Sequence, residues 1–202
     1  MRYFLDTTDG GPFAISMTSL LTDEHFMTQV ARGETAAFRQ LASRHLGRAY
    51  AIAFRLLQNR EDAEEVAQEA ISKVWQKAAV FDPSRSAFGT WFYRIVSNAA
   101  LDRLRRRKPP SENLDDYTEQ LSDNVPTGEA LLMKADASRH IKQAIATLPP
   151  TQQMAITLVY YEDFSQAEAA RIMNITTSAL EALLFRGKKG LRQRLTPRDL
   201  TP

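Results

Sequence analysis

The sequence contains no cysteine and only three histidines. Without cysteine the protein has neither disulfide bonds nor thiolate metal sites, which suits a protein of the reducing cytoplasm. His25, His45 and His140 are isolated, with no second metal ligand at helical spacing, so we expect no metal site. No residues have the pattern of a nucleophile with its base or of a glycine-rich phosphate loop. We therefore expect neither an enzyme nor a bound cofactor.

Long hydrophobic runs are also missing, since no apolar stretch approaches the roughly 20 residues of a membrane-spanning helix. Residues 1–16 lack the basic start and apolar run of a secretion signal, and Gly10, Gly11 and Pro12 interrupt any helix there. We expect residues 1–19 to be a disordered extension. The net charge is only +2, so any polyanionic ligand has to be inferred from the distribution of the charges.

Patterns typical of strands are nearly absent, whereas apolar residues recur at spacings of three and four almost throughout. We predict an all-α fold of two small helical domains joined by a flexible acidic linker. The predicted boundaries are residues 20–108 for the first domain, 109–134 for the linker, 135–196 for the second domain and 197–202 for a tail.

The linker is predicted from a change in composition. Residues 109–134 contain six acids, three prolines and one base, Lys134. Fully extended at about 3.4 Å per residue, such a linker would reach at most ~90 Å. Two domains joined in this way can bind two separate points on one long partner.

The second domain contains the pattern of a helix-turn-helix. Ser165 and Glu168 have the spacing of a capping box, Asn174 stands where a tight turn needs a left-handed residue, and Thr176 or Thr177 can cap the next helix. A plain αα-hairpin is the alternative. Seven bases against one acid between residues 171 and 198 favour DNA binding. On the second helix a projection at 100° per residue leaves a polar outer face opposite an apolar side made of Leu180, Leu184, Gly187 and Leu191.

The stretch SNAALDRLRRRKPP, residues 97–110, has five basic side chains between positions 103 and 108. Such a run is either a solvated helix end or a surface for nucleic acid. Thr90 can cap a helix from Trp91 to Arg107, on which one strip combines arginine, asparagine and an aromatic edge, and Asp102 can hold Arg105 or Arg106. The strip consists of Trp91, Arg94, Asn98, Leu101, Asp102 and Arg105. The predicted buried side consists of Phe92, Ile95, Val96, Ala99 and Ala100.

After a predicted break at residues 58–60, a further helix is predicted from Asn59 to Lys77, with Asn59 at its cap position, an apolar stripe and an acidic opposite face. Acids early in a helix suit its dipole, so this face is either a stabilising and solubilising feature or a docking surface for a protein. The apolar stripe consists of Ala63, Val66, Ala67, Ala70, Ile71, Val74 and Trp75. The opposite face consists of Asp62, Glu65, Gln68, Glu69 and Ser72.

Between about Phe38 and Leu195 the chain resembles bacterial RNA polymerase sigma factors of the extracytoplasmic-function (ECF) class. Residues 61–75 (EDAEEVAQEAISKVW) resemble the family's polymerase-binding helix, and residues 88–108 (FGTWFYRIVSNAALDRLRRRK) its segment for melting and reading the −10 promoter element. Residues 148–195 resemble the domain that reads the −35 element.

The resemblance implies a dissociable subunit that binds core RNA polymerase and directs it to promoter DNA, held inactive by an anti-sigma factor. The residues that would face a coiled coil of the polymerase are Asp62, Glu65, Gln68 and Glu69. The residues that would contact the −10 element are Trp91, Arg94, Asn98, Asp102 and Arg105, with Arg103, Arg106, Arg107 and Lys108 on its phosphates. The residues that would contact the −35 element are Thr177, Ser178, Glu181, Arg186, Lys188 and Lys189.

One departure from the family pattern concerns this last set. Glu181, Ala182 and Leu183 stand where basic or hydroxyl side chains are familiar. Glu181 would repel phosphate or accept a hydrogen bond from a cytosine amino group. Two other interpretations remain open: a stand-alone helix-turn-helix transcriptional regulator that binds as a dimer, and a helical adaptor with no role on DNA.

Overall fold

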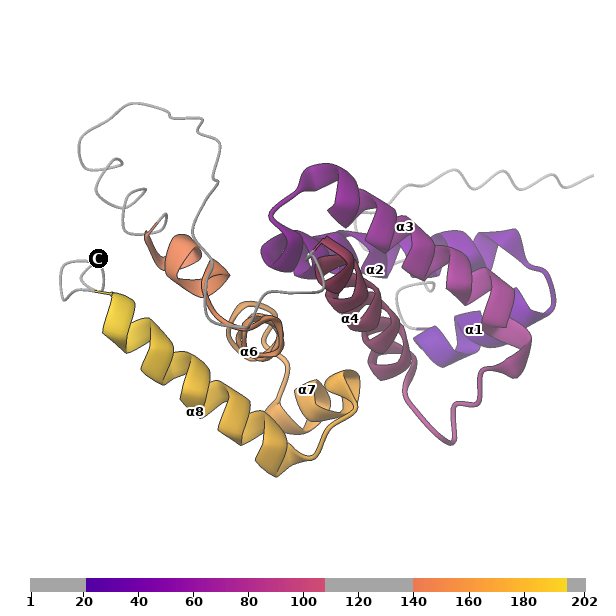
Figure 1. Ribbon diagram of the computed structural model, residues 1–202. Helices are drawn as coiled ribbons and strands as arrows, with labels where there is room; N and C mark the ends of the chain where they lie inside the picture. Colours follow the sequence, from indigo (N-terminus) through magenta and orange to yellow (C-terminus); the bar gives the residue numbers. More distant parts are fainter. Residues whose placement is uncertain (1–20, 108–139, 196–202) are drawn as a thin grey trace, which may run out of the picture.

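The computed structural model describes residues 21–107 and 140–195, and the regular structure in both stretches is helical (Figure 1). The first stretch contains α1 (Asp23–Ala31), α2 (Thr35–Leu57), α3 (Arg60–Lys77), the 3-10 helix η2 (Ala78–Val80) and α4 (Phe88–Arg107). The second contains a helix over residues 140–146, α6 (Pro150–Ile156), the π-helical η3 (Thr157–Tyr161), α7 (Gln166–Met173) and α8 (Thr177–Arg194). The predicted all-α fold is confirmed. The predicted linker and both predicted terminal segments lie entirely outside the described residues.

The helix ends of the first stretch follow from local signals. The chain turns between α1 and α2 at Gly33, whose φ of +87° is a conformation that favours glycine. α2 ends at Gln58 in the left-handed region, and the Asn59 side chain caps α3 by accepting a hydrogen bond from the Asp62 backbone N–H at 2.9 Å. The predicted cap is confirmed, and the predicted break is found at residues 58–59, since Arg60 already belongs to α3.

The predicted start of α4 at Trp91, with Thr90 as its cap, is wrong. α4 begins at Phe88, and the carboxylate of Glu24 on α1 accepts a hydrogen bond from the Phe88 backbone N–H at 2.9 Å. A helix N-terminus attracts an anion that satisfies its unpaired N–H groups. The cap comes from a residue 64 positions away, so the local sequence pattern does not contain it.

The core of the first stretch lies where α1, α2, α3 and α4 meet, and its members are almost fully buried. Of the predicted α3 stripe, Trp75 is the exception: it is 42% exposed, and its indole meets Phe38 edge-on at 5.4 Å. An indole is large, and here it covers the rim of the core. The fully buried residues from the three longer helices include Leu41, Ile52, Val66, Val74, Phe92 and Val96.

The second stretch is built on α8, whose predicted buried side is confirmed. Leu180, Leu184 and Gly187 are buried, and a Cβ at Gly187 would stand 2.8 Å from the Cδ1 atom of Ile156, so the glycine lets α6 approach α8. Gln153 is also buried and donates hydrogen bonds to the carbonyls of Ala146 and Leu148. This amide satisfies carbonyls at the end of the 140–146 helix.

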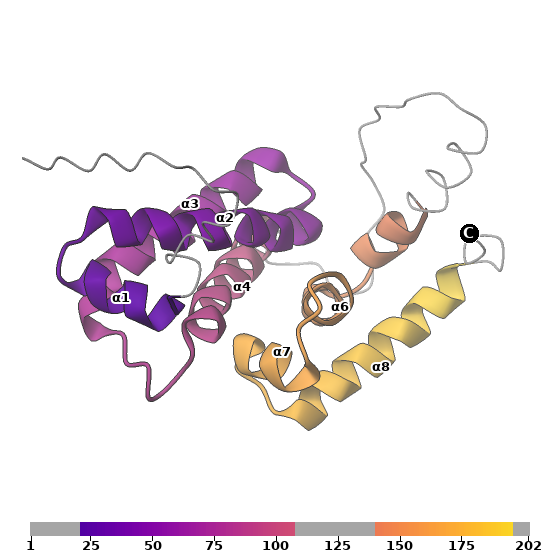
Figure 2. The same ribbon diagram turned by 180° about the vertical axis from the view of Figure 1, so that it is seen from behind.

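The two stretches pack against each other along α4 and α7. In both views α7 lies beside α4, and α6 and α7 lie between α4 and α8 (Figures 1 and 2). Tyr93 of α4 is absent from the predicted buried side but is only 3% exposed, and its ring meets Phe164 edge-on at 5.3 Å. The second half of the chain therefore buries a side of α4 that the spacing of apolar residues in α4 does not predict to be buried.

Candidate nucleic-acid interface

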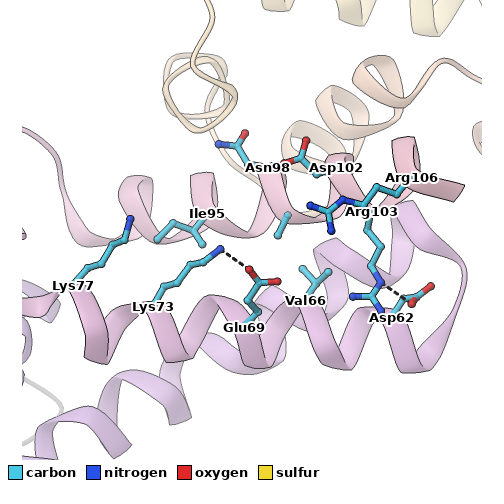
Figure 3. Close-up of a pocket in the computed structure, with 11 residues that line it drawn as sticks. Asp62, Val66, Glu69, Lys73, Lys77, Ile95, Asn98, Asp102, Arg103 and Arg106 are labelled. Carbon is cyan, nitrogen blue, oxygen red and sulfur yellow. Dashed lines mark hydrogen bonds and ion pairs between the residues drawn. The ribbon is translucent and has the colours of Figure 1, made fainter. Parts of the chain in front are cut away.

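A groove of about 710 Å³ runs between α3 and α4 and is lined by charged side chains from both helices (Figure 3). α3 contributes Asp62, Glu69, Lys73 and Lys77, and α4 contributes Asn98, Asp102, Arg103 and Arg106. The residues that the sequence assigns to polymerase and to the −10 element thus share one surface.

Arg103 joins the two sets directly. Its Nε donates to the Asp62 carboxylate at 2.7 Å, and its Nη2 donates to the Glu65 carboxylate. The Asp62 side chain is only 14% exposed, whereas that of Arg103 is 34% exposed. Arg103 therefore holds the C-terminal part of α4 against α3, a role that the charge run alone does not indicate. Its predicted phosphate contact stays a prediction.

The residues of the predicted strip on α4 lie on one surface, but their side chains differ in how far they are exposed. Asn98, Asp102 and Arg105 are exposed, whereas Trp91 and Arg94 are half-buried. The Asp102 carboxylate pairs with Arg105 at 3.3 Å, so of the two predicted partners it holds Arg105. The side chain of Arg107 and the whole of Lys108 lie outside the described residues.

The acidic face of α3 is exposed except at its N-terminal end. The Glu65 and Glu69 side chains are 63% and 54% exposed, and Gln68 is also exposed. Glu69 accepts a hydrogen bond from Lys73 at 2.6 Å, one helical turn further on. Such a pair contributes little to stability in water, so the face keeps carboxylates that a basic partner can reach.

A second cleft, of about 690 Å³, lies between the two halves. Trp91 and Arg94 line it from α4, and Arg171, Asn174 and Thr176 line it from the helix-turn-helix. Arg85, from the loop before α4, adds a third guanidinium. Arg85 and Arg171 are absent from the contacts predicted from the sequence, although helical periodicity alone places Arg171 outside the core of α7.

The turn of the helix-turn-helix has the predicted geometry. The Ser165 hydroxyl accepts from the Glu168 backbone N–H while the Glu168 carboxylate accepts from the Ser165 backbone, which completes the capping box. The Ser165 hydroxyl and backbone hydrogen bonds lower the pKa of Glu168. Asn174 is left-handed, with φ 55°, and Thr176 rather than Thr177 caps α8 by accepting from the Ala179 N–H at 3.2 Å.

α8 presents the predicted −35 set on its surface. All six members are exposed: Thr177, Ser178, Glu181, Arg186, Lys188 and Lys189. Lys188 is turned toward η3, where its ammonium lies 4.8 Å from the centre of the Tyr160 ring. Phe185 is 70% exposed and is absent from the predicted contacts. An exposed aromatic on a helix that carries basic residues suits contact with a thymine methyl group.

Comparison with known proteins identifies both halves. Residues 41–109 match the family model of Sigma-70 region 2, and residues 138–191 match that of Sigma-70, region 4. The chain is 32% identical over 181 residues to the ECF RNA polymerase sigma factor SigW of Bacillus subtilis, an alignment that covers 85% of this chain and 95% of SigW. This chain belongs to the ECF sigma factors. It is also 30% identical over 192 residues to the ECF RNA polymerase sigma-E factor of Escherichia coli K12, covering 90% and 98% of the two chains.

Solved structures agree on the fold of this sigma factor. CnrH, in complex with the cytosolic domain of CnrY, is 26% identical with a TM-score of 0.62, over 85% of this chain and 95% of CnrH. The sigma factor RpoE of Bartonella quintana, in complex with the anti-sigma factor NepR, is 21% identical with a TM-score of 0.57, over 77% and 94%. The family match covers both halves, whereas a stand-alone helix-turn-helix regulator would account for the second half alone.

Two features are absent from the described ranges, a membrane-spanning helix and a metal-binding cluster. Within residues 21–107 and 140–195, no helix has both the length and the apolar character needed to cross a membrane. In the same ranges no three histidine or carboxylate side chains are grouped so that they could hold a metal ion.

Proposed function

We propose that this sigma factor docks on core RNA polymerase through the acidic face of α3 and places α4 and α8 on two separate promoter elements. The observation that supports this assignment is the distribution of charge over the fold. Exposed carboxylates gather on one face of α3, whereas exposed bases gather at the C-terminal end of α4 and in the C-terminal half of α8, which belongs to the second half of the chain. Basic residues that served only solubility would not need to be concentrated on two helices in two separate domains, whereas contacts to DNA phosphates at two sites would require this.

The docking surface on polymerase would consist of Glu65, Gln68 and Glu69, with Asp62 beneath them. Asp62 is half-buried and bound by Arg103, so its contribution is to anchor α4 beside the docking surface. Glu65 and Glu69 have the exposure that a basic coiled coil would require.

On α4 the exposed Asn98 and the half-buried Arg94 and Trp91 would read unpaired bases of the −10 element, since amide, guanidinium and indole groups suit base edges and base stacking. Arg105, held by Asp102, would face the −10 element with them, and Arg106 would contact its phosphates. On α8 the hydroxyls of Thr177 and Ser178 with Arg186 and Lys189 would contact the −35 element, the N-terminal part of the helix entering the major groove.

Four further assignments accompany this proposal. The protein would act as an initiation factor without catalysing a reaction, and it would work in the cytoplasm. Its domains would follow the boundaries 20–108 and 135–196. An anti-sigma factor would hold it inactive: a relative with this fold, CnrH, was solved in complex with the cytosolic domain of another protein.

The proposal is tested by adding the purified chain to sigma-free core polymerase and measuring run-off transcription from a genomic promoter library. We expect start sites that core polymerase alone does not produce. If no new start sites form, the chain does not direct initiation. A stand-alone regulator would instead show specific DNA binding without polymerase.

The docking surface is tested by reversing two charges, Glu65→Lys with Glu69→Lys. Binding to immobilised core polymerase should fall by at least tenfold while the helical circular dichroism is unchanged. Glu34→Lys with Glu64→Lys makes the same change in net charge elsewhere and serves as the matched control. Equal affinity of the two double variants would remove the docking assignment.

A further inference from the structure

Besides the packing of α7 on α4, a buried carboxylate links the two described halves of this sigma factor. Glu162, in the loop between η3 and α7, has a side chain only 8% exposed. It accepts a hydrogen bond from the Nε of Arg48 at 3.1 Å and another from Arg55, both on α2 and more than 100 residues earlier in the chain. Arg48 also donates to the backbone carbonyl of Glu162.

Aromatic rings surround this pair of arginines. The Arg48 guanidinium lies 3.9 Å from the centre of the Phe164 ring, and that of Arg55 lies 5.0 Å from the centre of Tyr161. An aromatic ring against a guanidinium attracts its charge and shields one side of it from water, although both arginine side chains stay about a third exposed. We call Arg48, Arg55, Glu162 and Phe164 the Glu162 clasp.

The clasp continues into the first half through Tyr93. The Tyr93 hydroxyl lies 2.8 Å from Nδ1 of His45, and Nε2 of His45 lies 2.7 Å from Asp23. Burial raises the pKa of Tyr93 to about 12, against the opposing effect of the Arg48 charge, so at neutral pH the phenol keeps its proton as a donor. Hydrogen bonds therefore run from Asp23 on α1 through His45 on α2 to Tyr93 on α4. From Tyr93 the link to the clasp is by ring contacts, since its ring lies 5.3 Å from the Arg48 guanidinium and meets Phe164 edge-on.

In the structure the two halves are packed together, an arrangement that we call closed. In this arrangement they cannot bind two separate promoter elements at the same time. Elements centred at −10 and −35 are 25 base pairs apart, about 85 Å along a straight duplex at ~3.4 Å per base pair. Here Arg94 of α4 and Thr176 at the start of α8 line the same cleft. The clasp has to open, and the predicted reach of the linker, ~90 Å, is sufficient for the separation.

We propose that the Glu162 clasp is an intramolecular lock that holds the free sigma factor closed and that releases when the two halves take up separate positions on polymerase and promoter. The need for release rests on the proposed function, whereas the closure itself does not. Opening transfers one carboxylate and two guanidinium groups back to water, so the lock is reversible. Removing the arginines leaves the buried Glu162 carboxylate without its counter-charge, and removing the Glu162 charge abolishes both ion pairs. Either change shifts the equilibrium toward the open form.

The lock is tested by measuring the distance between the halves in the full-length protein. Because the chain has no cysteine, Gln40→Cys and Gln193→Cys, both exposed, give one unique pair of nitroxide labels for pulsed electron paramagnetic resonance. We expect one narrow, short distance in the parent protein. Glu162→Gln should lower the ratio of closed to open protein at least tenfold, and Arg48→Met with Arg55→Met should act in the same direction.

Glu34→Gln, an exposed carboxamide substitution outside the clasp, is the matched control and should leave the distance unchanged. An unchanged distance in both clasp variants, or a broad distribution in the parent protein, would overturn the lock. A second measurement separates this idea from the proposed function. Glu162→Gln should bind core polymerase more tightly, because the competent open fraction is larger. Absence of any polymerase binding, with the distances as expected, would refute the sigma assignment and leave the lock standing.

Discussion

Arg103 provides the sharpest test of how the surface of the first half is organised. The sequence places it among phosphate contacts, whereas the structure pairs it with Asp62 at 2.7 Å and with Glu65. Replacing it by methionine keeps the apolar stem and removes the charge and both ion pairs. If the pairs hold α4 against α3, Arg103→Met will destabilise the protein as well as any complex with DNA.

The magnitude follows from the exposure of the two partners. Exposed ion pairs contribute about 0–1 kcal/mol, and hydrogen bonds to charged groups in buried positions contribute about 1.5–3 kcal/mol. With Asp62 14% and Arg103 34% exposed, the pair lies between these cases. Discounting for solvent screening, we expect a coupling energy between Arg103 and Asp62 of about 1–1.5 kcal/mol.

The assay is a double-mutant cycle by urea unfolding, followed by circular dichroism at 222 nm, on Arg103→Met, Asp62→Asn and the combined variant. Arg106→Met is the matched control. Arg106 lines the same groove, is exposed, and forms no ion pair within the described residues, so its loss should change the free energy of unfolding by less than about 0.5 kcal/mol.

A coupling energy below about 0.3 kcal/mol, or an equal loss of stability in Arg103→Met and Arg106→Met, would refute the reasoning. The m-values must also agree among the variants, because a change in m would indicate a different unfolding transition. In that case the ion pair seen here would contribute no more than other surface pairs, and Arg103 would be free to serve the phosphates.

Two further predictions concern the second half and the interface. Ser165→Ala removes the capping box of α7 and should lower the free energy of unfolding in urea titrations by about 1 kcal/mol. Replacing Ser178, which is exposed within α8, by alanine should not lower it. Equal losses in the two variants would contradict the cap assignment. Tyr93 is 3% exposed with its pKa raised to about 12, so the unfolded chain ionises first as the pH rises. The stability it contributes is complete below pH ~10 and is lost between pH ~10 and ~12, by up to about 1.4 kcal/mol per pH unit. Urea titrations across this range should show a shallower loss in Tyr93→Phe, and parallel curves would contradict the assignment.

Features that depend on neighbours within one helical turn could be predicted from the sequence. The Asn59 cap, the capping box at Ser165 and the left-handed Asn174 are all confirmed, because each is a contact between residues three or four apart or a backbone conformation that one residue favours. The buried side of α8 is confirmed for the same reason, since a helix repeats its faces every 3.6 residues.

Features that depend on which helices meet could not. The start of α4 was misplaced because its cap, Glu24, comes from another helix, and Trp75 was assigned to the core although the core ends beside it. The buried side of α4 lacked Tyr93, since the residues that cover it lie in the other half.

The sequence by itself determined that this chain is all-α, where its helix-turn-helix lies, and which family it resembles. Only the tertiary structure decided which charges are free and which are bound. Arg103 is paired with Glu65, 38 residues earlier, and Arg48 with Glu162, 114 residues later. A run of basic residues looks the same in the sequence whether its members face solvent, phosphate or a carboxylate. The difference arises only when helix packing brings a partner within a few ångströms and removes the water between them.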